Sequence, residues 1–202
     1  MGYFPFFIEL SDKRGLIVGG GAVALRKVEK LLPYQPGITV VAERILPEIE
    51  QIAGLTLIRE TFSPEMLENV DFVIAATDDP ELNKRISALC IEKKILVNAV
   101  DEPQSCGFIF PAVIKRKNLS VGISSSGMSP TAAVWLKEQL ENLLPERFDE
   151  IIEWLGEIRP MIKAKIEPKK RAAVLKALFD SAIAKNHPLN EGETAKILEE
   201  MA

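Results

Sequence analysis

The 202-residue chain is predicted to be an α/β protein built around a parallel β-sheet. Two observations predict this class. The apolar run Leu16–Val18 ends in three glycines and continues into a segment, 23–32, whose apolar residues have helical spacing. Further short apolar runs follow, separated by helical segments, which is typical of strands covered on both faces of a parallel sheet. The sequence therefore favours a Rossmann-like fold.

Polar or small residues follow the expected strands at comparable positions. Besides the first strand, we expect strands at 38–42, 55–58, 71–77 and 95–98, with a helix at 80–92. Ligands of such sheets bind beyond the carboxyl ends of the strands. We therefore expect the residues at four of these strand ends to converge on one ligand. These residues are Gly19, Glu43, Thr77 and Asn98.

The turn after the first strand has the spacing Gly19-x-Gly21-x-x-Ala24. Glycines let the backbone approach a pyrophosphate, which then lies on the positive N-terminus of the helix. The flanking strand and helix are the context that this fingerprint requires. The alternative is a tight turn that binds no ligand.

Glu43 and Arg44 end the second expected strand. A carboxylate at this place accepts hydrogen bonds from ribose hydroxyls and favours NAD, whereas an arginine can hold the 2′-phosphate of NADP. A solvated pair of loop residues is the alternative reading.

Two further segments carry groups suited to chemistry. Asp101 follows the fifth expected strand, where a carboxylate could act as a general base, or could be an exposed turn residue before a proline. Ser125 lies in the segment 124–130, whose hydroxyls and N–H groups could bind an anion or could only cap a helix. In that segment Ser129 is the expected N-cap and Pro130 the first helical residue.

Composition narrows the class of protein. Hydrophobic residues at 47% and charged residues at 27% are ordinary for a soluble protein, and no apolar run has the length of a membrane span. We expect no signal peptide, no membrane partner and a cytoplasmic location. The two cysteines form no metal motif and there is one histidine, so no metal site is predicted. Residues 1–113 hold 16 acidic against 11 basic side chains, which disfavours nucleic acid as a partner.

The second half of the chain is organised differently. Two strands, 112–116 and 119–124, are expected around a Lys-Asn turn, and the chain is helical from Ser129, with breaks at Pro160, Pro168 and Pro188. We therefore divide the chain into a dinucleotide-binding domain at 1–113, a small α+β region at 114–145 and a helical tail at 146–202. The middle region is too small to close its own core, so we expect it to form a homodimer.

Five motifs in order resemble those of one known family, the precorrin-2 dehydrogenase / sirohydrochlorin ferrochelatase family, the N-terminal module of siroheme synthases. The segments that carry the resemblance are Gly15–Ala24, Ala75–Asn83, Asn98–Pro103, Phe108–Ala112 and Ser124–Pro130. The resemblance implies oxidation of the tetrapyrrole precorrin-2 to sirohydrochlorin with NAD as hydride acceptor, followed by insertion of ferrous iron. It also implies a Rossmann domain, a dimerisation region and a helical tail. Methyl transfer is not expected.

The resemblance also assigns site residues. It places the family's catalytic aspartate on Asp101 and its active-site serine on Ser125, and its dinucleotide contacts on Gly19, Gly21, Ala22, Val23, Glu43 and Arg44. Relatives often have two glycines where this chain has Ser126 and Gly127. Basic residues in the second half are candidates for the tetrapyrrole carboxylates, and these are Lys115, Arg116, Lys117, Lys163, Lys165, Lys169, Lys170 and Arg171.

Other functions stay open. Some relatives lack the aspartate and act as dehydrogenases only, and its presence here keeps chelation open. A nicotinamide-dependent dehydrogenase for another substrate would not need the basic second half. A non-catalytic NAD-sensing domain would need a DNA-binding or gating module, and the tail shows no basic helix-turn-helix.

Overall fold

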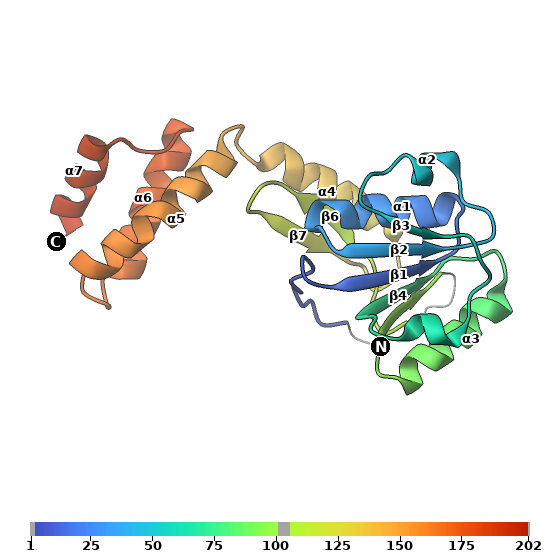
Figure 1. Ribbon diagram of the computed structural model, residues 1–202. Coiled ribbons are helices and arrows are strands. Elements are labelled where there is room, and N and C mark those ends of the chain that lie inside the picture. Colours follow the sequence, from blue (N-terminus) through green and yellow to red (C-terminus); the bar gives the residue numbers. More distant parts are fainter. Residues whose placement is uncertain (1–2, 101–105, 202) are drawn as a thin grey trace. The chain divides into compact units, whose positions relative to one another are not determined.

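The computed structural model describes residues 3–100 and 106–201, which form two compact units (Figure 1). One unit is Phe4–Phe110, and the other consists mainly of Pro111–Ala202. The hairpin formed by residues 112–123 begins at Ala112, so the whole hairpin lies in the second unit. The division of the second half near residue 145 stays a prediction.

The first unit contains the expected parallel sheet. Its strands follow the order β3-β2-β1-β4-β5, and every pair is parallel. Val18, at the end of β1, lies opposite Val41 on one side and Ala75 on the other, so three strands end at the same level. The strand bounds are β1 (Arg14–Val18), β2 (Gly37–Val41), β3 (Thr56–Ile58), β4 (Phe72–Ala75) and β5 (Leu96–Ala99). The predicted Rossmann-like sheet is confirmed.

Helices cover both faces of the sheet (Figure 1). Ile17 points to the face covered by α1 (Ala22–Leu31) and α2 (Pro47–Glu50), while its neighbours Leu16 and Val18 point to the other face. That second face is covered by α3 (Pro80–Glu92), whose bounds are those predicted, and by the 3₁₀ turn η2 (Pro64–Leu67). A further 3₁₀ turn, η1 (Leu32–Tyr34), follows α1. Alternate residues of each strand thus supply two separate cores.

The second unit begins with a hairpin and a helix. Strands β6 (Ala112–Lys115) and β7 (Ser120–Ile123) pair antiparallel, and the Arg116 N–H closes the turn on the Leu119 carbonyl at 3.0 Å. In α4 (Pro130–Leu143) the Ser129 hydroxyl accepts from the Ala132 N–H at 3.2 Å, so the predicted cap and first-turn proline are confirmed.

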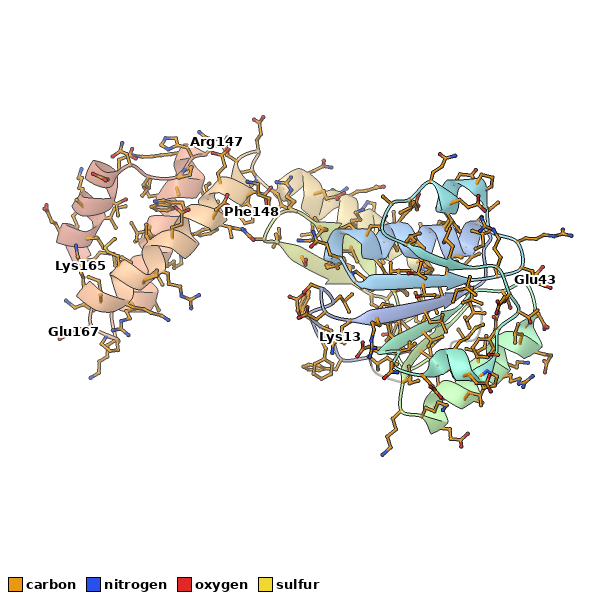
Figure 2. The ribbon with its side chains drawn as sticks, viewed as in Figure 1. Lys13, Glu43, Arg147, Phe148, Lys165 and Glu167 are labelled. Carbon is orange, nitrogen blue, oxygen red and sulfur yellow. The ribbon has the colours of Figure 1, made fainter. Side chains whose placement is uncertain are left out.

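Three helices complete the second unit and share one apolar core. Their bounds are α5 (Phe148–Lys165), α6 (Arg171–Lys185) and α7 (Glu191–Met201). Pro168 and Pro188 lie between helices, as predicted. The predicted break at Pro160 is wrong, because α5 continues through it to Lys165 (Figure 2). Ile151 and Ile162, one on each side of Pro160, are both fully buried in the shared core, and this burial holds the helix together across the proline.

Candidate functional site

A cavity of about 850 Å³ opens at the carboxyl ends of β1, β2 and β4. Seven of the eight predicted cofactor-binding residues line it, and these are Gly19, Gly21, Ala22, Val23, Glu43, Arg44 and Thr77. The cavity lies where the strand order reverses around β1, which is where open α/β sheets bind ligands.

The glycines of the first turn serve different purposes. Gly19 has φ +121°, and a Cβ there would lie 2.2 Å from the Ala76 carbonyl oxygen. A Cβ on Gly20 would lie 2.2 Å from the Arg44 carbonyl oxygen. Gly21 has an ordinary φ of −92°, and a Cβ there would meet no protein atom within 4 Å. The fold therefore requires Gly19 and Gly20, whereas the open space at Gly21 faces the cavity that it lines.

Three helices, α1, α2 and α3, begin at this cavity, and only α3 has a side-chain cap at its N-terminus. Asp79 caps α3, its carboxylate accepting from the Glu81 and Leu82 N–H groups at 2.9 and 3.2 Å. In α1 the cap residue is Gly21, which has no side chain to offer, and the first intrahelical bond runs from the Leu25 N–H to the Gly21 carbonyl. The preceding N–H groups of α1 have no acceptor within the helix, so this end can bind an anion.

Glu43 and Arg44 follow β2 after the single residue Ala42, and both are exposed and line the cavity. Figure 2 labels Glu43. A ribose held here would meet the Glu43 carboxylate, while a 2′-phosphate would meet one anionic and one cationic side chain. The cavity wall also carries Glu60, Asp78 and Asp79. Four acidic side chains, those three and Glu43, thus line the cavity together with the basic Arg44.

Thr77 lies in the loop between β4 and α3, and the buried Asn83 of α3 holds it in place. The Thr77 hydroxyl lies 2.8 Å from Asn83 Oδ1, which also accepts from the Thr77 N–H at 3.2 Å. Asn83 Nδ2 donates to the Thr77 carbonyl at 3.0 Å. The cavity wall at this point is therefore fixed from behind by a helix.

Asn98 does not line this cavity. It is buried inside β5, which ends one residue later than predicted, and its Nδ2 donates to the Phe108 carbonyl at 3.0 Å. Its Oδ1 accepts from Lys27 Nζ at 3.2 Å, and this ammonium lies 4.0 Å from the centroid of the Phe110 ring. Asn98 joins β5, α1 and the segment after residue 106 rather than facing the cavity.

The two predicted catalytic residues fall in different places. Asp101 lies outside the described residues. Ser125 belongs to the second unit, in the loop between β7 and α4, where its Oγ accepts from the Ser129 N–H at 2.9 Å. The next residues, Ser126 and Gly127, have φ values of +54° and +83°. Left-handed backbone favours glycine, so Ser126 adopts a conformation that is unfavourable for a residue with a Cβ.

Several basic candidates are engaged within the second unit. Arg171 donates to the Ile166 and Lys163 carbonyls and so closes the end of α5, and Lys117 pairs with Glu153 at 3.3 Å. Lys163, Lys165 and Lys169 are exposed.

Burial raises the pKa of the Cys90 thiol to about 11, which makes it a poor nucleophile. Within 3–100 and 106–201, no three His, Cys, Asp or Glu side chains are grouped as around a metal. None of the helices described there is long and apolar enough to cross a membrane.

Sequence reasoning missed several lining residues. Glu60, Thr61 and Phe62 line the cavity just beyond β3, and the rule that found Glu43 beyond β2 would have found them. Asn83 gave a weaker signal, since an asparagine among the apolar positions of a helix has no unique meaning in a sequence.

The sheet, the glycine turn and the open helix N-terminus define a dinucleotide-binding α/β protein. Two family models agree with this class. The model described as "Putative NAD(P)-binding" matches residues 6–112, and the one described as "Sirohaem biosynthesis protein central" matches residues 116–143. The chain therefore belongs to this NAD(P)-binding family, and the segment that follows matches the central family of sirohaem biosynthesis proteins.

Curated relatives and a solved structure are similar over most of the chain. A siroheme synthase of Sodalis glossinidius is 41% identical over 82% of this chain, and one of Pseudoalteromonas translucida is 35% identical over 97%. The aligned parts are only 36% and 42% of those two proteins. A solved structure named "SirC, precorrin-2 dehydrogenase" covers 98% of both chains with a TM-score of 0.75 and 27% identity.

Proposed function

We propose that the protein oxidises precorrin-2 to sirohydrochlorin with NAD as the hydride acceptor. The observation that carries this is Gly21, whose missing side chain leaves open space in a cavity at an uncapped helix N-terminus. The substrate is suggested by the match to a precorrin-2 dehydrogenase along nearly its whole length. In this reading the first turn holds the pyrophosphate and Glu43 holds the adenine ribose.

The oxidation removes a hydride and a proton from the macrocycle. Bound NAD supplies the hydride acceptor. The proton needs a base, and we assign this role to Asp101, which comes two positions after Ala99, the last residue of β5, in the sequence. Ser125, the second assigned catalytic residue, is proposed to position the reacting groups through its hydroxyl.

The proposal includes a second reaction, insertion of ferrous iron into sirohydrochlorin. Its support is that the curated relatives are named siroheme synthases. Iron here is a substrate, and the two pyrrole protons that it displaces would pass to Asp101 one after the other, the first being released to solvent before the second is accepted. The alternative is a dehydrogenase without chelatase activity.

The assembly that we propose is a homodimer formed through β6, β7 and α4. In this segment the structure buries Ile114 and Ala133, while Trp135 and Leu143 are 59% and 75% exposed.

We propose that the carboxylates of the tetrapyrrole bind exposed lysines of the second unit, Lys163, Lys165 and Lys169. A cytoplasmic location also stays a prediction, since a chain with only two cysteines and no evident disulfide framework suits a reducing compartment.

Anaerobic assays of the two half-reactions test this function. Wild type should reduce NAD only when precorrin-2 is present. Asp101→Ala should lose about 10²–10⁴-fold in the oxidation rate while still binding NAD, since it loses only the base. Single-turnover oxidation by folded Asp101→Ala at the wild-type rate would remove Asp101 from the mechanism. Iron insertion by wild type but not by this variant would support one base for both steps.

A further inference from the structure

The loop between β4 and α3 forms the cavity wall on the β4 side, through Ala76, Thr77, Asp78 and Asp79. The polar groups of Thr77 form hydrogen bonds within the protein. Besides the bonds to Asn83, its hydroxyl lies 3.0 Å from the Asp79 carbonyl and accepts from the Asp79 N–H at 3.2 Å. Because these groups already have partners, Thr77 shapes the wall and does not offer a donor to the cavity.

Asn83 is the buried half of this arrangement. Its side chain is on α3, only 3% of the residue is exposed, and three of its hydrogen bonds go to the single residue Thr77. Burying a carboxamide is unfavourable unless its hydrogen bonds are made, so an apolar side chain would serve better if packing were the only need. What Asn83 provides is a single conformation of the loop.

The position of this loop indicates what it meets. A Cβ at Gly19 would lie 3.1 Å from the Thr77 backbone nitrogen, so the loop packs directly against the glycine turn. With the pyrophosphate on that turn and Glu43 on the β2 side, a dinucleotide extends its other half toward β4. The wall that this half reaches is the loop held by Asn83.

We propose that Asn83 is a positioning residue for the nicotinamide half of the cofactor. It acts through Thr77, by fixing the backbone of the β4–α3 loop against which that half seats. The proposal rests on the proposed function insofar as the dinucleotide is NAD. It assigns Thr77 to the shape of the wall, in place of a direct hydrogen bond to the cofactor.

Calorimetric titration of Asn83→Ala with NAD and with ADP tests this role. ADP has the adenosine and the pyrophosphate but no nicotinamide riboside, so it reports on the half of the site away from β4. We expect the Kd for NAD to rise about tenfold, as for loss of a buried hydrogen-bond network, and the Kd for ADP to change less than about twofold.

Ile86→Ala is the matched control. Ile86 is on the same helix and fully buried, but it lies in the apolar core and does not line the cavity. It should lower the thermal midpoint without changing the ratio of the two dissociation constants. Equal weakening of NAD and ADP by Asn83→Ala, or no weakening of either, would overturn the proposal. A wild type that binds ADP but not NAD would instead refute the proposed function.

Asn83→Asp guards against a variant that fails to fold. It keeps the size of the side chain and an acceptor for the Thr77 N–H. A protonated carboxyl can donate to the Thr77 carbonyl as the amide does, whereas an ionised one cannot. Burial at this position raises the pKa of a carboxyl above about 3.9, so NAD affinity of this variant, relative to wild type, should recover as the pH falls from about 8 to about 4. A ratio that does not change with pH would contradict the role given to the Nδ2 donor.

Discussion

Gly19 and Gly21 belong to the same turn but are needed for different reasons. Gly19 is needed by the fold, since its φ is positive and a Cβ there would clash with the Ala76 carbonyl oxygen. Gly21 has neither constraint. Substitution at the two positions should therefore separate folding from binding.

Gly21→Val and Gly21→Ser should fold and yet lose NAD binding. A Cβ at this position meets open space, so the fold tolerates it, but it occupies the approach of the pyrophosphate. Serine would also cap α1, so Gly21→Ser should match or exceed wild-type stability by a few tenths of a kcal/mol. Titration with NAD and thermal melting measure the two effects. Gly19→Ala, by contrast, should lower the thermal midpoint, and unchanged NAD affinity in folded Gly21→Val would refute the assigned site.

Glu43 should give a preference for NAD over NADP. A 2′-phosphate next to its carboxylate would be repelled, and the hydrogen bonds to two ribose hydroxyls would be lost. Glu43→Gln should therefore reduce the ratio of kcat/KM for NAD to that for NADP by about tenfold, and Arg44→Ala should raise it. Glu48→Gln is a suitable control because Glu48 is exposed on α2 and does not line the cavity. Comparable efficiency of wild type with both cofactors would contradict this assignment.

At the scale of single elements, the first unit was predictable and the long helix α5 was not. Local signals sufficed where β-branched runs end in glycine or where Asp79 and Pro80 begin a helix. Pro160 misled because a proline within a helix is normally a break, and only the packing of Ile151 and Ile162 against other helices overrides it. The end of β5 lies at Ala99, one residue beyond the predicted Asn98, and a shift of one residue at a strand end decides which side chain reaches the cavity.

Pro160 should therefore destabilise α5 without serving the cavity. It has no N–H for the Gly156 carbonyl four residues earlier, and Gly156 itself is a poor helix former. Pro160→Ala should raise the free energy of unfolding by about 1–3 kcal/mol, measured by urea denaturation. Pro168→Ala, between helices, should instead cost about 0.4–1 kcal/mol through the entropy of the unfolded chain. A loss of stability in Pro160→Ala would contradict this expectation.

For the whole molecule, the fold and the class of cofactor could be predicted from the sequence. The contacts between residues far apart in the chain could be found only in the structure. The cavity joins segments from residue 18 to residue 82, and the spacing of strand ends was enough to bring most of them together. The link between Thr77 and Asn83 was not visible, because hydrogen bonds between a loop and a helix leave no periodic pattern.

The middle of the chain gives the prediction that concerns the assembly. A two-stranded hairpin and one helix cannot bury enough apolar surface to be stable alone, and α4 leaves Val134, Trp135 and Leu136 more than 40% exposed. A second copy of the chain would cover these side chains through a twofold interface. Sedimentation equilibrium at micromolar concentration should therefore show a dimer, and Trp135→Glu should shift it toward monomer. Ile91→Glu is the matched control, because Ile91 is 61% exposed but belongs to the first unit, so it should leave the dimer intact. A wild-type monomer at that concentration would exclude the homodimer.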